Sequence, residues 1–179
     1  MDLSKEAAAI EKAWRGRKIK HLDSVPQLGS ARYPLLRIRE IARRSLTARS
    51  AVEINFLEDM AVFLTSCQYV PDPELHGSAD RWQTAEQFEA LKKGDCEEFS
   101  LWSWKKLLVL GYDARLTLGR FKGGGHVWVT LFIEGAAHIY EGTQGLGYSV
   151  EPTTTSVQRA QDYEPHCSID ARLQFYRHV

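Results

Sequence analysis

Apolar residues recur at three- and four-residue spacing through the first half of the chain, which is typical of amphipathic helices. The predicted helices run from Ser4 to about Lys20, from Leu35 into the following arginines, and from about Ala51 to Cys67. Residues 21–34 form a predicted connector rich in Gly, Ser and Pro, and residues 69–79 form a second loop with two prolines. Thr84 then predicts the N-cap of a short helix.

A stretch in the middle of the chain predicts a buried helix with a cysteine in its first turn. Asp95 is a suitable N-cap, and Glu98, three residues later, completes a capping-box pattern. The helix is apolar on most faces up to Gly111, and such a helix is buried. The helix dipole favours a thiolate at Cys96. Glu97 and Glu98 oppose this, so a reactive thiol needs a cationic partner from elsewhere in the chain.

After Gly111 the apolar period changes from that of a helix to that of a strand. The predicted strands are residues 114–118, 126–133 and 138–141. Residues 134–137 form a predicted hairpin turn, a glycine-rich turn follows Glu141, and residues 169–176 predict an edge strand. This order predicts an α+β fold in which a central helix with Cys96 packs on an antiparallel β-sheet, with further helices at the N-terminus.

Composition narrows the class of protein. The chain has 179 residues, of which 44% are hydrophobic, and a formal net charge of zero. We therefore expect one domain, no nucleic-acid partner and no membrane partner, while the oligomeric state stays open. The three cysteines form no Cys-x-x-Cys pair, which favours a reducing compartment over a disulfide scaffold. No signal peptide or transmembrane segment is apparent, and we expect a cytoplasmic location.

Spacing disfavours several kinds of site. The Gly123–Gly125 run leads into a strand, whereas phosphate-binding loops lead into a helix. The histidines and cysteines form no common short pair of metal ligands, so we expect no metal and no cofactor. No Gly-x-Ser-x-Gly serine motif is present. The remaining combination is Cys96, His126 at the start of a strand, and Glu141 on the next strand. An imidazole can take the thiol proton, and a third polar group can orient the imidazole ring.

Strand alternation places His126 and Glu141 on the same face of the predicted sheet. A loop centred on Gly135-Ala136 pairs Glu141 with Thr130. Thr130 is four residues from His126, or roughly 13 Å along the strand. A bulge or strong twist would then be needed to bring the two side chains together.

The same residues carry a family resemblance. Four segments resemble the transglutaminase-like branch of the papain-like cysteine enzymes, and most closely the bacterial transglutaminase-like cysteine proteinases. These segments are Trp82-x-Thr84, Gly94-Asp95-Cys96-Glu97-Glu98-Phe99, Gly125-His126-Val127-Trp128-Val129 and Tyr140-Glu141-Gly142-Thr143. The resemblance covers about residues 69–145. It implies that Cys96 is the nucleophile, that His126 is the general base and acid, and that Glu141 occupies the orienting position, where Asp is usual.

We expect one papain-like, transglutaminase-like domain over residues 1–179. Its predicted parts are a helical N-terminal part (1–68), a catalytic core (69–150) and a C-terminal segment (151–179). The backbone N–H of Cys96 can donate to an oxyanion, and Trp82 and Gln87 are candidates for a second donor. Trp128 shares a strand face with His126 and can wall the site.

The leading functional hypothesis is a cysteine-dependent enzyme that transfers acyl groups from amides through a thioester, with a protein or peptide as substrate. The sequence leaves peptidase, deamidase and transglutaminase activity open. The alternative is a catalytically inactive transglutaminase-like binding module, which Glu97 and Glu98 beside the thiol support. A third hypothesis is a scaffold that binds a partner through its basic N-terminal helices.

Overall fold

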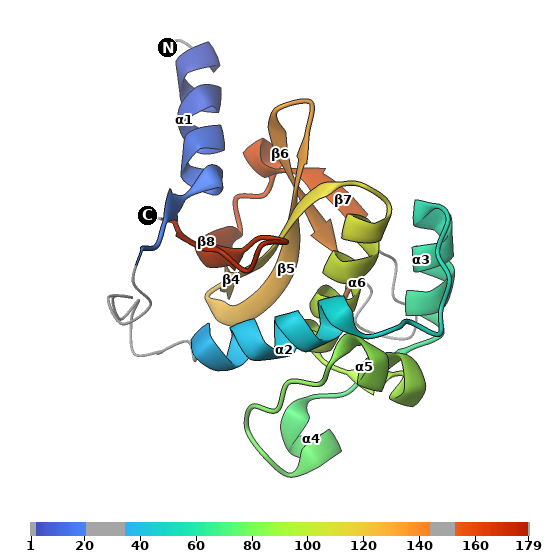
Figure 1. The fold of residues 1–179 in the computed structure, drawn as a ribbon. Helices are drawn as coiled ribbons and strands as arrows, with labels where there is room; N and C mark the ends of the chain where they lie inside the picture. Colours follow the sequence, from blue (N-terminus) through green and yellow to red (C-terminus); the bar gives the residue numbers. More distant parts are fainter. Residues whose placement is uncertain (1–2, 21–34, 144–152, 179) are drawn as a thin grey trace.

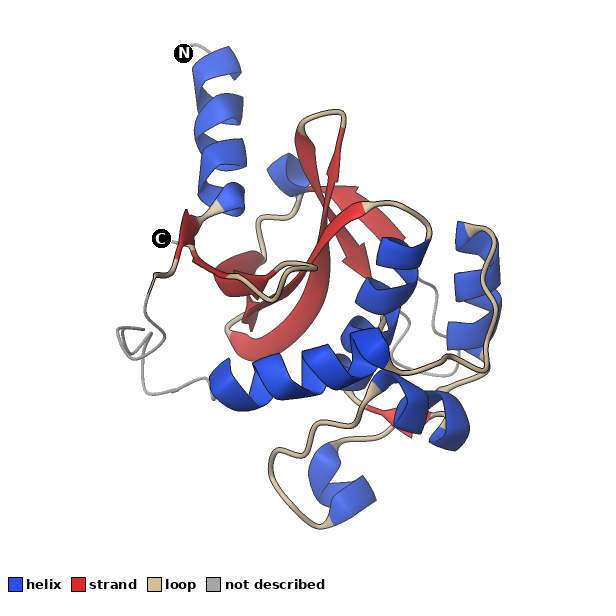
Figure 2. Cartoon of the chain, in the orientation of Figure 1, coloured by secondary structure: helices blue, strands red, loops and turns tan. Residues whose placement is uncertain are grey.

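The computed structural model describes residues 3–20, 35–143 and 153–178, and a seven-stranded sheet runs through its middle (Figure 1, Figure 2). The strand order is β1-β9-β8-β4-β5-β6-β7, and all neighbouring strands are antiparallel. The strands are β1 (Arg17–Lys18), β4 (Asp113–Phe121), β5 (Gly124–Ile133), β6 (Ala136–Glu141), β7 (Thr153–Ser156), β8 (Tyr163–Ile169) and β9 (Phe175–Arg177).

The α-helices of the described residues all precede β4 in the chain. They are α1 (Leu3–Arg15), α2 (Leu35–Thr47), α3 (Leu57–Thr65), α4 (Asp72–His76), α5 (Ala85–Leu91) and α6 (Cys96–Val109), with a 3-10 turn, η2 (Val157–Arg159). Two short strands, β2 (Gln68–Tyr69) and β3 (Lys93–Gly94), pair in parallel, and β3 directly precedes α6. The α+β fold class predicted from the sequence, with the Cys96 helix on an antiparallel sheet, is confirmed.

The central helix α6 begins where the sequence predicts. The Asp95 side chain accepts a hydrogen bond from the Glu97 N–H at 3.3 Å, and the Glu98 side chain accepts one from the Asp95 N–H at 2.9 Å. These bonds satisfy backbone donors that a helix N-terminus leaves unpaired. The helix packs on one face of the sheet, and its fully buried side chains include Trp102, Trp104 and Leu107.

The opposite face of the sheet forms a smaller core beneath α1. Trp14 of α1 packs on Trp128 of β5 with 6.1 Å between the ring centroids, and Phe132 belongs to the same cluster. Val127 and Val129 belong instead to the core around α6. Because successive strand residues point to opposite faces, the even-numbered residues of β5 lie on the α1 side of the sheet.

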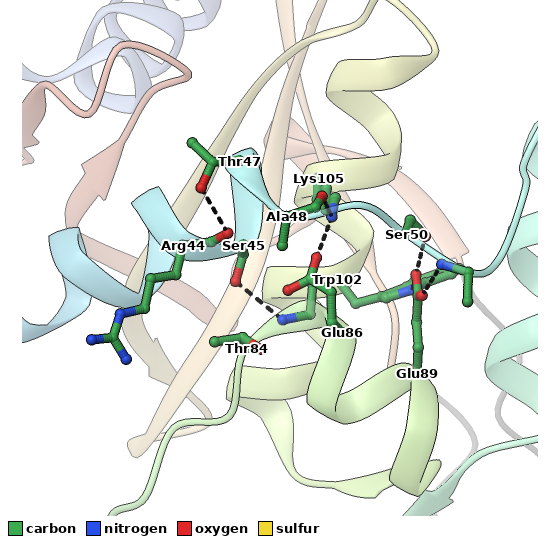
Figure 3. A network of polar contacts seen from close by, with 12 residues as sticks. Arg44, Ser45, Thr47, Ala48, Ser50, Thr84, Glu86, Glu89, Trp102 and Lys105 are labelled. Carbon is green, nitrogen blue, oxygen red and sulfur yellow. Dashed lines mark hydrogen bonds and ion pairs between the residues drawn. The ribbon is translucent and has the colours of Figure 1, made fainter.

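A buried polar network joins α5 and α6 to the segment that follows α2 (Figure 3). Glu89 accepts hydrogen bonds from the Trp102 indole and the Ala51 N–H, both at 2.9 Å, and from the Ser50 hydroxyl. It also pairs with Lys106 at 2.9 Å. Burial alone would raise the pKa of Glu89, but these hydrogen bonds outweigh it and hold the pKa below its usual range.

Two of the predicted helices are shorter than the sequence indicated. α1 ends at Arg15 rather than near Lys20, because Gly16 adopts a positive φ of 64° and the next two residues form β1. α3 begins at Leu57 rather than near Ala51, because the residues before it are held by the polar network and by the Asp59 carboxylate, which accepts from two preceding backbone N–H groups.

The loop and C-terminal predictions also need correction. Residues 69–79 contain the short helix α4, since a proline in the first helical turn is compatible with a helix. The C-terminal segment contributes three strands rather than one, and β8 lies inside the sheet between β9 and β4. The predicted connector at residues 21–34 and most of the glycine-rich turn after Glu141 lie outside the described residues.

Within the described ranges, no helix has the length and apolar character needed to cross a membrane.

We expect Glu89→Gln to lower the free energy of unfolding by about 3–5 kcal/mol, because it leaves the buried Lys106 ammonium without an anion. Lys106→Met should cost less, since Glu89 keeps the donors from Ser50, Ala51 and Trp102. Folding lowers the pKa of Glu89, so its stabilisation is complete above about pH 4.5 and is lost as the pH falls through the folded-state value. Urea unfolding at several pH values measures this. Equal losses from both variants would contradict the role assigned to the network.

Candidate active site

Cys96 lies where the first turn of α6 meets the start of β5. The Ser100 hydroxyl, one turn after Cys96, donates a hydrogen bond to the Val127 carbonyl oxygen at 2.8 Å. The Val127 backbone N–H faces the Cys96 thiol. The carbonyl group and the N–H group of Val127 therefore both interact with α6. The Cys96 thiol lies beside Val127, the strand residue that follows His126.

The β5–β6 hairpin brings His126 and Glu141 together. Its turn residues, Glu134-Gly135, have positive φ angles of 51° and 86°, as tight two-residue hairpin turns require. The observed register places Glu141 opposite Trp128, roughly 7 Å along the strand from His126. The predicted pairing with Thr130 was wrong, because it centred the turn one residue too far along the chain. His126 Nε2 and Glu141 Oε2 are 2.7 Å apart, and no bulge in β5 or β6 is needed.

Glu141 is buried, and four donors hold its two carboxylate oxygens. Oε1 accepts from the Thr143 N–H at 3.0 Å and from its hydroxyl at 2.6 Å. Oε2 accepts from the Tyr163 hydroxyl at 3.0 Å and contacts His126. Burial alone would raise the pKa of Glu141, but the hydrogen bonds from His126 and Thr143 outweigh it and lower the pKa. The carboxylate is therefore ionised and can orient the imidazole ring.

Aromatic rings surround the His126 imidazole. The ring centroids of Phe121, Trp128 and Tyr163 lie 5.5, 6.1 and 6.2 Å from that of His126. Trp128 is fully buried, stacks on His126 and makes a tilted ring contact with Trp14 of α1. These rings limit the orientations of the imidazole. Glu141 contacts Nε2, so Nδ1 is the ring nitrogen that Glu141 does not hold.

The surroundings of the thiol are acidic. Burial is the main cause that raises the pKa of Cys96 well above its usual range, and the charges of Glu97 and Asp95 add to it, while the Val127 N–H opposes the shift. The thiol donates to Glu97 Oε2 at 3.2 Å. Burial and the neighbouring Asp95 raise the pKa of Glu97 to about 9. In this arrangement the thiol is protonated.

A third carboxylate approaches this cluster from α4. Asp72 is buried, its backbone N–H donates to Asp95 Oδ2 at 3.3 Å, and its Oδ2 accepts from the Arg81 N–H. Its other oxygen, Oδ1, has no hydrogen-bond partner among the described residues. One ligand atom from each of Asp95, Cys96 and Glu97 lies within 4.8 Å of the others. This cluster is the place in the described chain where a cation could be held.

The candidates for a second oxyanion donor lie on and before α5. Gln87 completes a capping box there, because its side-chain oxygen accepts from the Thr84 N–H at 2.8 Å. Trp82 and Gln87 line a pocket of about 390 Å³ together with His76, Arg81, Gln83, Ala90 and Leu91. Within the described residues, no hydrogen bond joins Trp82 or Gln87 to Cys96 or His126, so both stay predictions.

Sequence reasoning missed two residues at the site. Tyr163 reaches Glu141 from β8, and no short-range pattern marks it, since only the pairing of β8 with β4 brings it close. Tyr69 precedes the site on β2, where burial and then the charges of Cys96 and Asp95 raise its pKa. Its ring lies 6.1 Å from that of Phe99 in the first turn of α6.

Comparison with known proteins identifies the fold. No protein-family model and no curated protein matches the chain. Among solved structures, Legionella pneumophila LapG is similar in its EGTA-treated form (18% identity, TM-score 0.55, covering 97% of this chain and 86% of LapG). The calcium-bound form is also similar (19% identity, TM-score 0.54, covering 93% and 87%). The chain therefore has the fold of LapG.

Proposed function

We propose that this protein is a cysteine-dependent enzyme that transfers the acyl group of an amide through a thioester on Cys96. The observation that carries the proposal is the 2.7 Å contact between His126 and an ionised Glu141, beside the strand residue that faces the thiol. The transglutaminase-like fold supports a protein or peptide as the substrate.

The first half-reaction forms the thioester. Glu141 holds Nε2 of His126. We propose that Nδ1, the other ring nitrogen, accepts the proton of the Cys96 thiol. The thiolate attacks the carbonyl carbon, and the Cys96 N–H at the helix N-terminus donates to the oxyanion. The C–N bond then breaks, and the imidazolium gives its proton to the leaving amine while the acyl group stays on sulfur.

The second half-reaction frees the thiol. His126 takes a proton from water, the resulting hydroxide attacks the thioester carbonyl, and the C–S bond breaks to release a carboxylic acid. The sulfur recovers its proton from the imidazolium. We propose water rather than an amine as the acceptor, because excluding water from the site requires more covering structure than a short chain offers.

The second candidate is a catalytically inactive binding module of the same fold. The observation that favours it is the high pKa of Cys96 and the hydrogen bond from the thiol to Glu97. A thiol that stays protonated at neutral pH is a poor nucleophile.

A divalent cation would remove this obstacle. The similar protein LapG has been solved in a calcium-bound form. Carboxylate oxygens are ligands that Ca²⁺ prefers. Asp72 Oδ1, which has no hydrogen-bond partner among the described residues, and the crowded carboxylates of Asp95 and Glu97 fit such an ion. We propose that these three side chains hold it, although the sequence alone suggested no metal. The ion would supply positive charge beside Cys96 and so favour the thiolate.

We predict that iodoacetamide modifies Cys96 well below pH 8.5, the usual thiol range, when calcium is present. Cys67 and Cys167 should react far more slowly, because burial raises the pKa values of their thiols to about 11 and about 12. Peptide mass spectrometry after timed labelling gives the rate at each cysteine.

In this experiment His126→Ala should slow the labelling of Cys96 by at least about a hundredfold, the size of a typical general-base contribution. His138→Ala is the matched control, since His138 lies on the neighbouring strand opposite Leu131 and outside the site. If Cys96 labels no faster than Cys67 and Cys167, or if both histidine variants behave like wild type, the enzyme proposal fails and the binding module is favoured.

We also predict that Glu97→Gln lowers the pKa of the Cys96 thiol in EGTA, because it removes the neighbouring carboxylate charge. In EGTA this variant should label faster than wild type above about pH 9, where Glu97 of the wild type is ionised, and calcium should no longer accelerate it. Asp95→Asn keeps a good N-cap residue and should likewise lose the calcium response. Calcium titration calorimetry on the same variants reports binding directly. An undiminished calcium affinity in both would remove these two side chains from the proposed cation site.

A further inference from the structure

We infer that Tyr163 is a positioning residue of this site, whose hydroxyl holds the Glu141 oxygen that aims His126. The inference rests on the proposed function, since it concerns the orientation of the proposed base. Tyr163 is the first residue of β8 and lies opposite Phe121 of β4. Its hydroxyl lies 3.0 Å from Glu141 Oε2, the same oxygen that contacts His126 Nε2.

The two oxygens of Glu141 are held by different parts of the chain. Thr143, two residues along, holds Oε1 with two hydrogen bonds. A carboxylate held at one oxygen can still swing its other oxygen, because the side-chain torsions of glutamate remain free. Tyr163 and His126 meet at this second oxygen. The Tyr163 hydroxyl therefore fixes Oε2 in the place where it accepts the imidazole N–H.

The position of the Tyr163 hydroxyl is itself fixed by packing. The Tyr163 ring centroid lies 4.5 Å from that of Phe121 and 5.2 Å from that of Trp128. Gly119 permits this close approach of β8 and Trp128, because a Cβ there would lie 2.0 Å from the Glu164 carbonyl oxygen and 2.7 Å from the Trp128 ring. The donor is therefore in place before any substrate binds, which is how a positioning group acts.

The test separates the hydroxyl from the ring. Tyr163→Phe keeps the aromatic packing and removes only the O–H group. We expect it to slow the labelling of Cys96 by iodoacetamide at pH 7 with calcium by about tenfold, the effect of weakening one hydrogen bond to a charged group. Tyr176→Phe is the matched control, because its hydroxyl also donates to a carboxylate, Asp170 Oδ2, at 3.0 Å, away from the site. It should label at the wild-type rate.

A double-mutant cycle shows whether Tyr163 acts through Glu141. Glu141→Ala should slow the labelling, and adding Tyr163→Phe to it should have no further effect. As a spectroscopic readout, the ring N–H proton of His126 should exchange with water faster in Tyr163→Phe than in wild type. A tenfold loss that persists in the Glu141→Ala background would overturn the inference, as would a Tyr163→Phe variant with wild-type rate and exchange.

The same measurements distinguish this inference from the proposed function. If wild-type Cys96 shows no labelling that depends on His126, the proposed function fails, and this inference fails with it. If the wild-type dependence on His126 holds and Tyr163→Phe equals wild type in rate and in proton exchange, only the role of Tyr163 is overturned.

Discussion

The first turn of α6 packs against the start of β5, and the site is built around this contact. Ser100 uses the carbonyl oxygen of Val127, and the N–H of the same residue faces Cys96. A helix that begins with a cap and stays apolar on most faces must be buried, and here the burial occurs on the sheet. The contact therefore brings the thiol next to the strand residue after His126.

Two carboxylates at the site have opposite states for physical reasons. Glu141 is buried but receives four donors, and its pKa falls. Glu97 is buried beside Asp95, and its pKa rises to about 9. The first carboxylate is therefore ionised, while burial and the acidic cluster around the second raise the pKa of the Cys96 thiol.

Local signals explain which features the sequence predicted. The capping box of α6 lies within four consecutive residues, so Asp95 and Glu98 could be identified directly. The β5–β6 register could not be predicted, because Glu134 adopts a positive φ, which is uncommon for glutamate. Tyr163 could not be found either, since it reaches Glu141 only through the pairing of β8 with β4. Residues that meet through long-range pairing leave no pattern in a single sequence.

The most direct test of the central claim is to look for an acyl group on Cys96. The protein with calcium would be mixed with a p-nitrophenyl ester, a generic activated acyl donor, quenched in acid and examined by peptide mass spectrometry. The account predicts an acyl adduct on Cys96 that forms together with a burst of p-nitrophenol, is lost from Cys96→Ser and forms slowly in His126→Ala. An adduct spread evenly over Cys67, Cys96 and Cys167, or no adduct on any cysteine, would contradict it.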